Sequence, residues 1–170
     1  MRLTGKVALV TGASAGIGKG VARRLASEGA DLWLADINAG AGEEVAHQIQ
    51  RDFGVGVSFG RTDVSERAEV EAMVQAALVR FGRVDILVNN AWGPRPGRRG
   101  HSRLETQDDA DVDWALRIGT RTALWAMQAV FPGMRERRWG RVINMCSLNG
   151  VNAHPFSVDY NMAKEALRTL

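Results

Sequence analysis

The stretch KVALVTGASAGIG at residues 6–18 decides the fold. Residues 6–11 form a mostly apolar run with β-branched side chains, which is typical of a buried strand. After the first glycine, the apolar residues between positions 17 and 25 recur on one face of a helix with a period of 3.6 residues. The stretch therefore predicts a strand, a glycine-rich turn and a helix in direct succession.

The same pattern of strand followed by helix occurs four more times along the chain. The predicted strands cover residues 6–11, 31–35, 55–60, 84–89 and 141–145, and the later helices cover residues 42–51, 66–81, 111–131 and 160–170. Continuous apolar strands separated by amphipathic helices are typical of a parallel sheet covered on both faces. We predict one domain over residues 1–170, a three-layer, doubly wound α/β fold of Rossmann type with strand order 3-2-1-4-5.

Three glycines mark expected ends of helices. Gly29, Gly82 and Gly140 each follow a predicted helix and precede a predicted strand. We expect them to stop the helix or to form the turn that leads into the strand.

Composition limits the class of protein. The chain has 170 residues, of which 45% are hydrophobic and 24% charged, as in an ordinary globular domain and unlike a disordered or disulfide-stapled chain. The lone Cys146 cannot form an internal disulfide, so we expect a reducing, cytoplasmic location. The longest apolar stretch, residues 123–131, is shorter than the roughly 20 residues of a membrane span and predicts a buried helix.

The sequence gives little support for nucleic-acid binding or for a metal site. A net charge of +3 does not require a nucleic-acid partner, although basic residues concentrate at 95–103 and 135–141. His47, His101 and His154 lack the spacing of metal ligands, so we expect no metal site.

The remaining conspicuous side chains have ordinary explanations. We expect Cys146 to be a small buried residue at a strand end, because no partner histidine is evident for a nucleophile. Four arginines could meet an anion, but a solvated loop is the favoured interpretation for Arg95, Arg98, Arg99 and Arg103. Three large side chains are expected in a helix core or at a subunit contact, namely Trp114, Trp125 and Met127.

The glycine turn at residues 11–18, TGASAGIG, is suited to binding a phosphate. Glycines there let backbone N–H groups approach a pyrophosphate, and the start of the helix supplies partial positive charge. The spacing is G-x-x-x-G-x-G, not the commoner G-x-G-x-x-G. A turn that only needs flexible glycines is the alternative interpretation.

Asp36 ends the second predicted strand, 18 residues after Gly18. An acidic side chain near this offset accepts hydrogen bonds from the hydroxyls of an adenosine ribose, and its charge repels a 2′-phosphate. Neither Ala15 nor Ile37 supplies a cation for such a phosphate, so the pattern favours NAD over NADP. The alternative is that Asp36 only caps the following helix.

Tyr160 and Lys164 are four residues apart on the last predicted helix, which places a phenol and an ammonium on one face. Such a pair can carry out acid/base chemistry, because the ammonium stabilises the phenolate. Many surface helices carry this spacing by chance, but Tyr160 is the only tyrosine in the chain.

Taken together, these segments resemble the short-chain dehydrogenase/reductase family over essentially the whole chain. Ser147 lies 13 residues before Tyr160, which is the usual interval in that family. The matching segments are TGASAGIG at 11–18, Asp36, Asp63-Val64, Asn89-Asn90-Ala91, Ser147 and Tyr160-x-x-x-Lys164.

The resemblance implies roles for individual residues. Tyr160 is the expected general acid/base, Ser147 orients the substrate oxygen, and Lys164 holds the nicotinamide ribose and favours the phenolate of Tyr160. The residues expected to contact the cofactor are Gly12, Ser14, Ala15, Gly16, Ile17, Gly18, Asp36, Asp63, Val64, Asn90, Ala91, Tyr160 and Lys164. The implied reaction is NAD-dependent hydride transfer between nicotinamide and a secondary alcohol or ketone, as in a ketoreductase. The resemblance also implies a homodimer or tetramer for the full-length form.

The chain departs from the family pattern in three places. Gly119 occupies the position of an asparagine that seats a water in the proton relay, and Trp92 replaces the glycine that completes Asn-Asn-Ala. The family chain also continues for two strands and a substrate-binding loop beyond residue 170, so the sequence resembles a truncated form whose fifth strand is an edge. The alternative function is therefore a dinucleotide-binding fragment without catalysis.

Overall fold

A computed structural model describes residues 1–98 and 102–170 and contains one parallel sheet of five strands. The strand order is β3-β2-β1-β4-β5, which confirms the predicted topology and fold class. The strands are β1 (Val7–Thr11), β2 (Asp31–Asp36), β3 (Val57–Arg61), β4 (Ile86–Asn89) and β5 (Arg141–Asn144).

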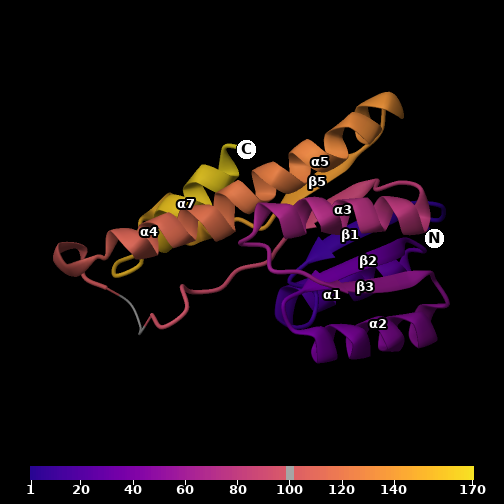
Figure 1. Cartoon of the computed structure of the whole chain (residues 1–170), viewed down its shortest axis with the longest axis horizontal. Helices are drawn as coiled ribbons and strands as arrows, with labels where there is room; N and C mark the ends of the chain where they lie inside the picture. The colour runs from indigo at the N-terminus through magenta and orange to yellow at the C-terminus, as the bar shows by residue number, and fades with distance from the viewer. Residues whose placement is uncertain (99–101) are drawn as a thin grey trace.

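Helices cover both faces of the sheet (Figure 1). The helices before β4 are α1 (Gly16–Ser27), α2 (Ala39–Phe53) and α3 (Arg67–Phe81). Those after β4 are α4 (Asp109–Leu116), α5 (Thr122–Glu136), α6 (Leu148–Asn152) and α7 (Val158–Arg168), with the 3-10 turn η1 (Leu104–Thr106) and the π turn η2 (Arg117–Arg121).

Successive side chains of the central strands enter different layers of the core. Ala8 and Val10 of β1 pack with α1 and α2, whereas Leu9 between them packs with α3 and α5. Alternation of this kind follows from the two-residue period of a strand, and burial on both faces explains why the strands read as continuous apolar runs.

The predicted helix over residues 111–131 is longer and less regular than expected. It begins at Asp109, passes through the π turn η2 and continues to Glu136, with Pro132 inside α5. The expectation that residues 123–131 are buried is only partly correct, because Leu124 and Phe131 are exposed on the outer face of α5. Within the described residues, no helix is long and apolar enough to cross a membrane.

Two of the three predicted glycine turns have the left-handed backbone that ends a helix. Gly29 follows α1 with a φ of 90°, and Gly82 caps α3 with a φ of 73°. After α5 the left-handed residue is Arg138 instead of Gly140. A Cβ added at Gly140 would lie 2.5 Å from Sδ of Met134, so a glycine at this position allows the Met134 side chain to pack closely against the backbone.

β5 lies at the edge of the sheet, as the sequence predicted. It pairs with β4 from Ile86↔Arg141 to Asn89↔Asn144, and its side chains are only partly covered, with Ile143 exposed. The short helix α6, which the sequence analysis did not predict, leads from β5 toward α7.

The glycine turn brings the start of α1 against the end of β1. A Cβ added at Gly18 would lie 2.0 Å from the Gly12 carbonyl oxygen and 2.5 Å from Nδ2 of Asn90. Gly12 itself has a φ of 64°, a conformation that favours glycine. The glycines at 12 and 18 are therefore required by the close approach of backbone to backbone, and not only by flexibility.

This close approach predicts opposite effects for two Gly→Ala substitutions in α1. Gly18→Ala should lower the free energy of unfolding by about 3 kcal/mol or more, because backbone atoms must move to admit the methyl group. Gly20→Ala should raise it by about 0.5–1 kcal/mol, because Gly20 has open space around it and alanine is the better helix former. Urea unfolding followed by circular dichroism measures both, and equal effects would contradict the packing described for Gly18.

Candidate functional site

Asn90 links the end of β4 to the glycine turn by hydrogen bonds. Its Nδ2 donates to the carbonyl oxygens of Thr11 at 2.9 Å and of Gly12 at 3.1 Å. The Thr11 hydroxyl oxygen in turn accepts from the backbone N–H groups of Asn90 and Ala91. The carboxyl ends of the two central strands, β1 and β4, are thereby fixed side by side at the start of α1.

The first turn of α1 has no side-chain cap. Its N-cap residue is Ala15, which offers no acceptor, and the turn carries no acidic residue. The N–H groups at the start of a helix have no partner within the helix. Together with the left-handed Gly16, this leaves the backbone at residues 16–18 suited to an anionic ligand.

Asp36 holds the turn after β1 and does not cap a helix. One carboxylate oxygen accepts from the backbone N–H of Ser14 at 3.0 Å, and the other accepts from that of Asn38, also at 3.0 Å. The cap of α2 is Asn38, whose side chain accepts from the N–H of Ala41. The alternative explanation of Asp36 as a helix cap is therefore wrong.

A cavity of about 280 Å³ lies at the carboxyl ends of the strands. It is lined by five of the residues expected to contact a cofactor, which come from the turns after β1 to β4, and by the loop after β4. The lining residues are Gly12, Asp36, Ile37, Thr62, Asp63, Val64, Ala91, Trp92, Gly93, Pro94, Pro96, Trp114 and Ile118. We call this space the Asp36 cavity.

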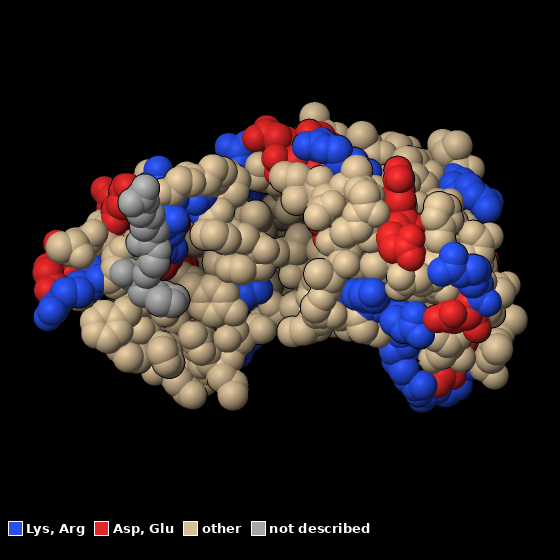
Figure 2. All heavy atoms as spheres, turned by 90° about the horizontal axis from the view of Figure 1, so that it is seen from below, with Lys and Arg blue, Asp and Glu red and all other residues tan. Residues whose placement is uncertain are grey.

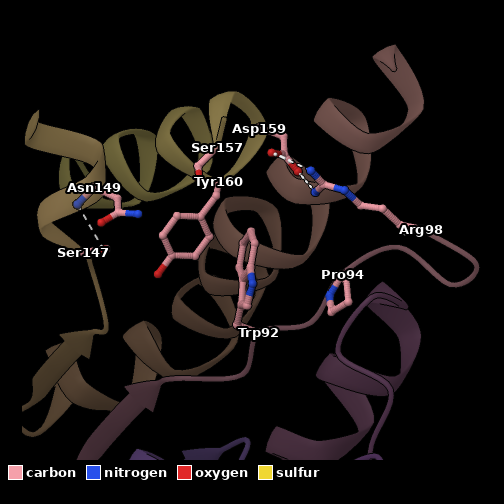
Figure 3. Close-up of a pocket in the computed structure, with 8 residues that line it drawn as sticks. All are labelled: Trp92, Pro94, Arg98, Ser147, Asn149, Ser157, Asp159 and Tyr160. Carbon is pink, nitrogen blue, oxygen red and sulfur yellow. Dashed lines mark hydrogen bonds and ion pairs between the residues drawn. The ribbon is translucent and has the colours of Figure 1, made fainter. Parts of the chain in front are cut away.

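A second cavity, of about 480 Å³, contains the predicted hydroxyl pair. Ser147 follows β5 and Tyr160 lies on α7, and both line this space with Trp92, Pro94, Arg98, Asn149, Ser157 and Asp159 (Figure 3). Ser147 is the N-cap of α6, and its Oγ accepts from the N–H of Asn149 at 3.2 Å. Its hydroxyl proton stays available to an incoming oxygen. We call this space the Tyr160 cavity.

The two cavities share a wall. Trp92 and Pro94, from the loop after β4, line both of them. The space lined by Ser147 and Tyr160 and the space lined by five of the predicted cofactor residues therefore adjoin the same short segment.

Lys164 is buried beside Tyr160. Only 5% of Lys164 is exposed, its Nζ donates to the Met145 carbonyl oxygen at 2.7 Å, and it lies 5.7 Å from the centroid of the Tyr160 ring. Burial lowers the pKa of Lys164 below its ordinary 10.5, and the negative charge that Cys146 carries when ionised acts in the opposite direction. The helix spacing thus brings the amine and the phenol together, as predicted.

The loop after β4 is only in part the solvated segment that the sequence analysis favoured, because Arg103 is exposed as expected whereas Arg95 and Arg98 pair with buried carboxylates. Arg98 forms an ion pair with Asp159, and its side chain is 12% exposed. Its Nε also lies 3.4 Å from Asp111, which accepts from Nε of Arg95 at 2.6 Å. The expectation fails for these two arginines because Asp111 and Asp159 are buried and need cationic partners. Arg99 lies outside the described residues.

Cys146, Trp114 and the metal-ligating side chains are the other groups for which the sequence analysis made a prediction. Cys146 is exposed, contrary to the expected burial, because it follows the edge strand β5. Trp114 is partly buried in the core, and its Nε1 donates to the Gly93 carbonyl. The residues of 1–98 and 102–170 contain no group of three metal-ligating side chains, and His101 lies outside them.

Acidic and basic side chains are interspersed on the face shown in Figure 2. Many of the described arginines are paired with carboxylates, such as Arg23 with Asp52 and Arg61 with Glu69. A continuous basic surface of the kind that nucleic acids require is not visible on that face.

The sequence missed several residues of the Tyr160 cavity. Arg98 lies in an irregular segment, and Asn149 lies on the short helix α6, so neither belongs to a periodic pattern. Asp159 could have been predicted as a cavity residue only because it directly precedes Tyr160 in the sequence.

The burial of Lys164 predicts a stability that depends on pH. Its lowered pKa means that the unfolded chain binds more protons between the folded-state pKa and 10.5, so unfolding becomes less favourable as pH rises through this interval. We expect the free energy of unfolding of the wild type, minus that of Lys164→Met, to increase with pH toward 10.5. Urea titrations at several pH values measure it, with Lys19→Met as the control for a lost ammonium. A difference that is flat or falls would contradict this prediction.

Known proteins share this architecture. The sequence pattern of the family described as short chain dehydrogenase matches residues 6–170. D-beta-hydroxybutyrate dehydrogenase from Cupriavidus necator is 36% identical over 168 residues, which cover 97% of this chain and 62% of that protein. An uncharacterized oxidoreductase from Staphylococcus aureus is 33% identical, with 99% of this chain and 69% of that protein covered.

Solved structures agree with these sequence relatives. An NAD⁺-bound xylitol dehydrogenase has a TM-score of 0.91 and 30% identity, and the match covers 99% of this chain and 63% of that one. L-sorbose reductase from Gluconobacter frateurii, complexed with NADPH and L-sorbose, has a TM-score of 0.92 and 31% identity, with the same coverage. The chain thus spans about three fifths of the length of several of its relatives, and it belongs to the short-chain dehydrogenase/reductase family.

Proposed function

We propose that this chain carries the dinucleotide-binding and acid/base core of an oxidoreductase that transfers hydride between a nicotinamide dinucleotide and a secondary alcohol or ketone. The observation that carries the proposal is the shared wall of the two cavities. Ser147 and Tyr160 lie on one side of Trp92 and Pro94, and Gly12 and Asp36 lie on the other. An extended ligand in the Asp36 cavity could therefore present one end to the hydroxyl pair.

The residues at the ends of the strands fit a dinucleotide. The uncapped start of α1 offers backbone N–H groups to a pyrophosphate, and Asp36 offers acceptors to ribose hydroxyls. We propose that Ser14, Ala15, Ile17, Asp63, Val64, Asn90 and Ala91 complete the contacts. When bound, the dinucleotide would supply the hydride donor or acceptor.

The chain itself would handle the proton. Tyr160 donates a proton to the carbonyl oxygen of a ketone during reduction, and its phenolate takes a proton from the alcohol in the reverse direction. Ser147 donates a hydrogen bond to the same oxygen and holds it in line with the phenol. The buried ammonium of Lys164, close to the Tyr160 ring, favours the phenolate by its charge and would hold a ribose hydroxyl.

Charge at the Asp36 cavity favours NAD over NADP in this proposal. The negative charge of Asp36 would repel a 2′-phosphate, and none of the described residues that line the cavity is a lysine or arginine. The structures similar to this chain include one with NAD⁺ and one with NADPH, so the preference depends on this chain's own residues.

Location and assembly belong to the same proposal. A cytoplasmic location follows from the single unpaired cysteine, and a homodimer or tetramer follows from the family resemblance. Light scattering of the purified protein measures the assembly directly. The second candidate function, dinucleotide binding without catalysis, is favoured by Gly119 in place of the relay asparagine.

Tyr160→Phe tests the proposed chemistry. We expect turnover of ketones with NADH to fall by about 10²–10⁴-fold, because the proton donor is lost. Dinucleotide binding, followed by NADH fluorescence, should change little and shows that the variant is folded. Turnover that survives would remove Tyr160 from its role, and a wild type that binds NADH without turnover would favour the second candidate.

Asp36→Asn tests the cofactor preference. The amide keeps an acceptor for the Ser14 or Asn38 N–H but loses the charge, so we expect the ratio of the NADP to NAD dissociation constants to fall by about tenfold or more, equivalent to about 1.4 kcal/mol. Asp52→Asn, at an exposed ion pair in α2, controls for the change in net charge. An unchanged ratio of the NADP and NAD dissociation constants would show that Asp36 only stabilises the turn after β1.

A further inference from the structure

The Tyr160 ring is held by packing against Trp92. The two ring centroids are 4.8 Å apart with an interplanar angle of 86°, which is a T-shaped contact (Figure 3). No side-chain hydrogen bond from the described residues, 1–98 and 102–170, reaches the Tyr160 hydroxyl. Edge-to-face contacts of this kind are favourable and have a defined geometry. The position of the phenol therefore depends on the indole.

Trp92 also lies against Lys164. The Lys164 Nζ is 5.0 Å from the centroid of the Trp92 ring and donates a hydrogen bond to the Met145 carbonyl oxygen. An indole attracts an ammonium most strongly where water is excluded, and Lys164 is only 5% exposed. Trp92 is thus the common neighbour of both groups of the predicted acid/base pair.

The space for the indole exists because residue 119 has no side chain. A Cβ at Gly119, in the π turn η2, would lie 2.9 Å from Cζ3 of Trp92 and 3.2 Å from Cβ of Ala163. Any larger side chain at this buried position would have to displace the Trp92 ring. Two departures from the family pattern, at positions 92 and 119, therefore meet at one contact in space.

The charged residues that line the Tyr160 cavity, Arg98 and Asp159, do not compete for the phenol. Arg98 and Asp159 are paired with each other across the loop and α7. Lys164 is therefore the charged group whose distance from Tyr160 the indole can control.

We propose that Trp92 is a positioning residue, which holds the Tyr160 phenol and the Lys164 ammonium in their reactive arrangement by filling the space that Gly119 leaves. The proposal rests on the proposed function, in which Tyr160 transfers the proton. Trp92 itself transfers no proton and acts through its two neighbours.

Substitution of Trp92 is the first test. We expect Trp92→Ala to lower kcat by about 10–100-fold, because small displacements of reacting groups are costly. The KM for the dinucleotide should change less than kcat, and Trp92→Phe should restore most of kcat because it keeps an aromatic ring. Trp139→Ala removes an indole before the start of β5, at the opposite end of the sheet, and should leave kcat unchanged. Equal losses of kcat in the two alanine variants, or none in Trp92→Ala, would overturn the proposal.

The single tyrosine provides a measurement that needs no turnover. With tyrosine selectively labelled, nuclear magnetic resonance of the ring protons follows Tyr160 alone, because the chain has one tyrosine. In the wild type the contact with Trp92 places these protons in the ring current of the indole. Their chemical shifts should therefore move toward those of an exposed tyrosine in Trp92→Ala and stay in place in Trp139→Ala. Unchanged shifts in Trp92→Ala would overturn the proposal even if the wild type has no activity.

Gly119→Ala tests the shared space. In the wild-type background the methyl group must displace the indole, so we expect a lower urea midpoint and a change in the same Tyr160 ring resonances as in Trp92→Ala. In the Trp92→Ala background the same substitution should have little effect, because the obstructing ring is gone. Additive effects would overturn the proposal. If the wild type shows no turnover but the effects of Gly119→Ala and Trp92→Ala are not additive, the proposed function is wrong and the contact between the two positions stands.

Discussion

The site depends on one close contact, the approach of Gly18 in α1 to the carbonyl of Gly12. No side chain fits between them, since a Cβ would be 2.0 Å from that oxygen. The contact brings the uncapped start of α1 to the end of β1, and Asn90 extends the same junction to β4. Gly12 of this junction lines the Asp36 cavity, and the loop that follows Asn90 supplies Trp92 and Pro94, which line both the Asp36 cavity and the Tyr160 cavity.

Much of the fold was predictable because the features that determine it are local and periodic. Strands buried on both faces, such as β1 and β4, have apolar side chains at every position, and the alternation with helices implies a parallel order. The hydroxyl of Ser147, the phenol of Tyr160 and the amine of Lys164 were predicted as site groups from spacing and family resemblance. The ion pairs of Arg98 were not, because they join an irregular loop to α4 and α7, and no periodic pattern reports contacts between distant segments. The burial of Cys146 was predicted wrongly because it was judged from its neighbours along the chain, whereas exposure depends on β5 being an edge.

Sequence alone treated positions 92 and 119 as two separate departures from the family pattern. The structure shows them as one contact, in which a large ring lies over a glycine. The same ring contacts Tyr160 and Lys164. Substitutions far apart in a chain can thus compensate in volume, and their effect on a site is understood only when they are considered as a pair.

Two residues near the Asp36 cavity differ in which substitutions they permit. Asn90 directly precedes the lining residue Ala91, and its amide donates to two carbonyl oxygens. An isosteric carboxylate at position 90 would place like partial charges together, and an alkyl chain would leave both acceptors unsatisfied. Ile37 lines the cavity, is 59% exposed, and has a side chain on which no hydrogen bond depends. Evolutionary change in nucleotide selectivity would therefore be concentrated at exposed lining positions such as Ile37, while Asn90 stays fixed by its hydrogen bonds.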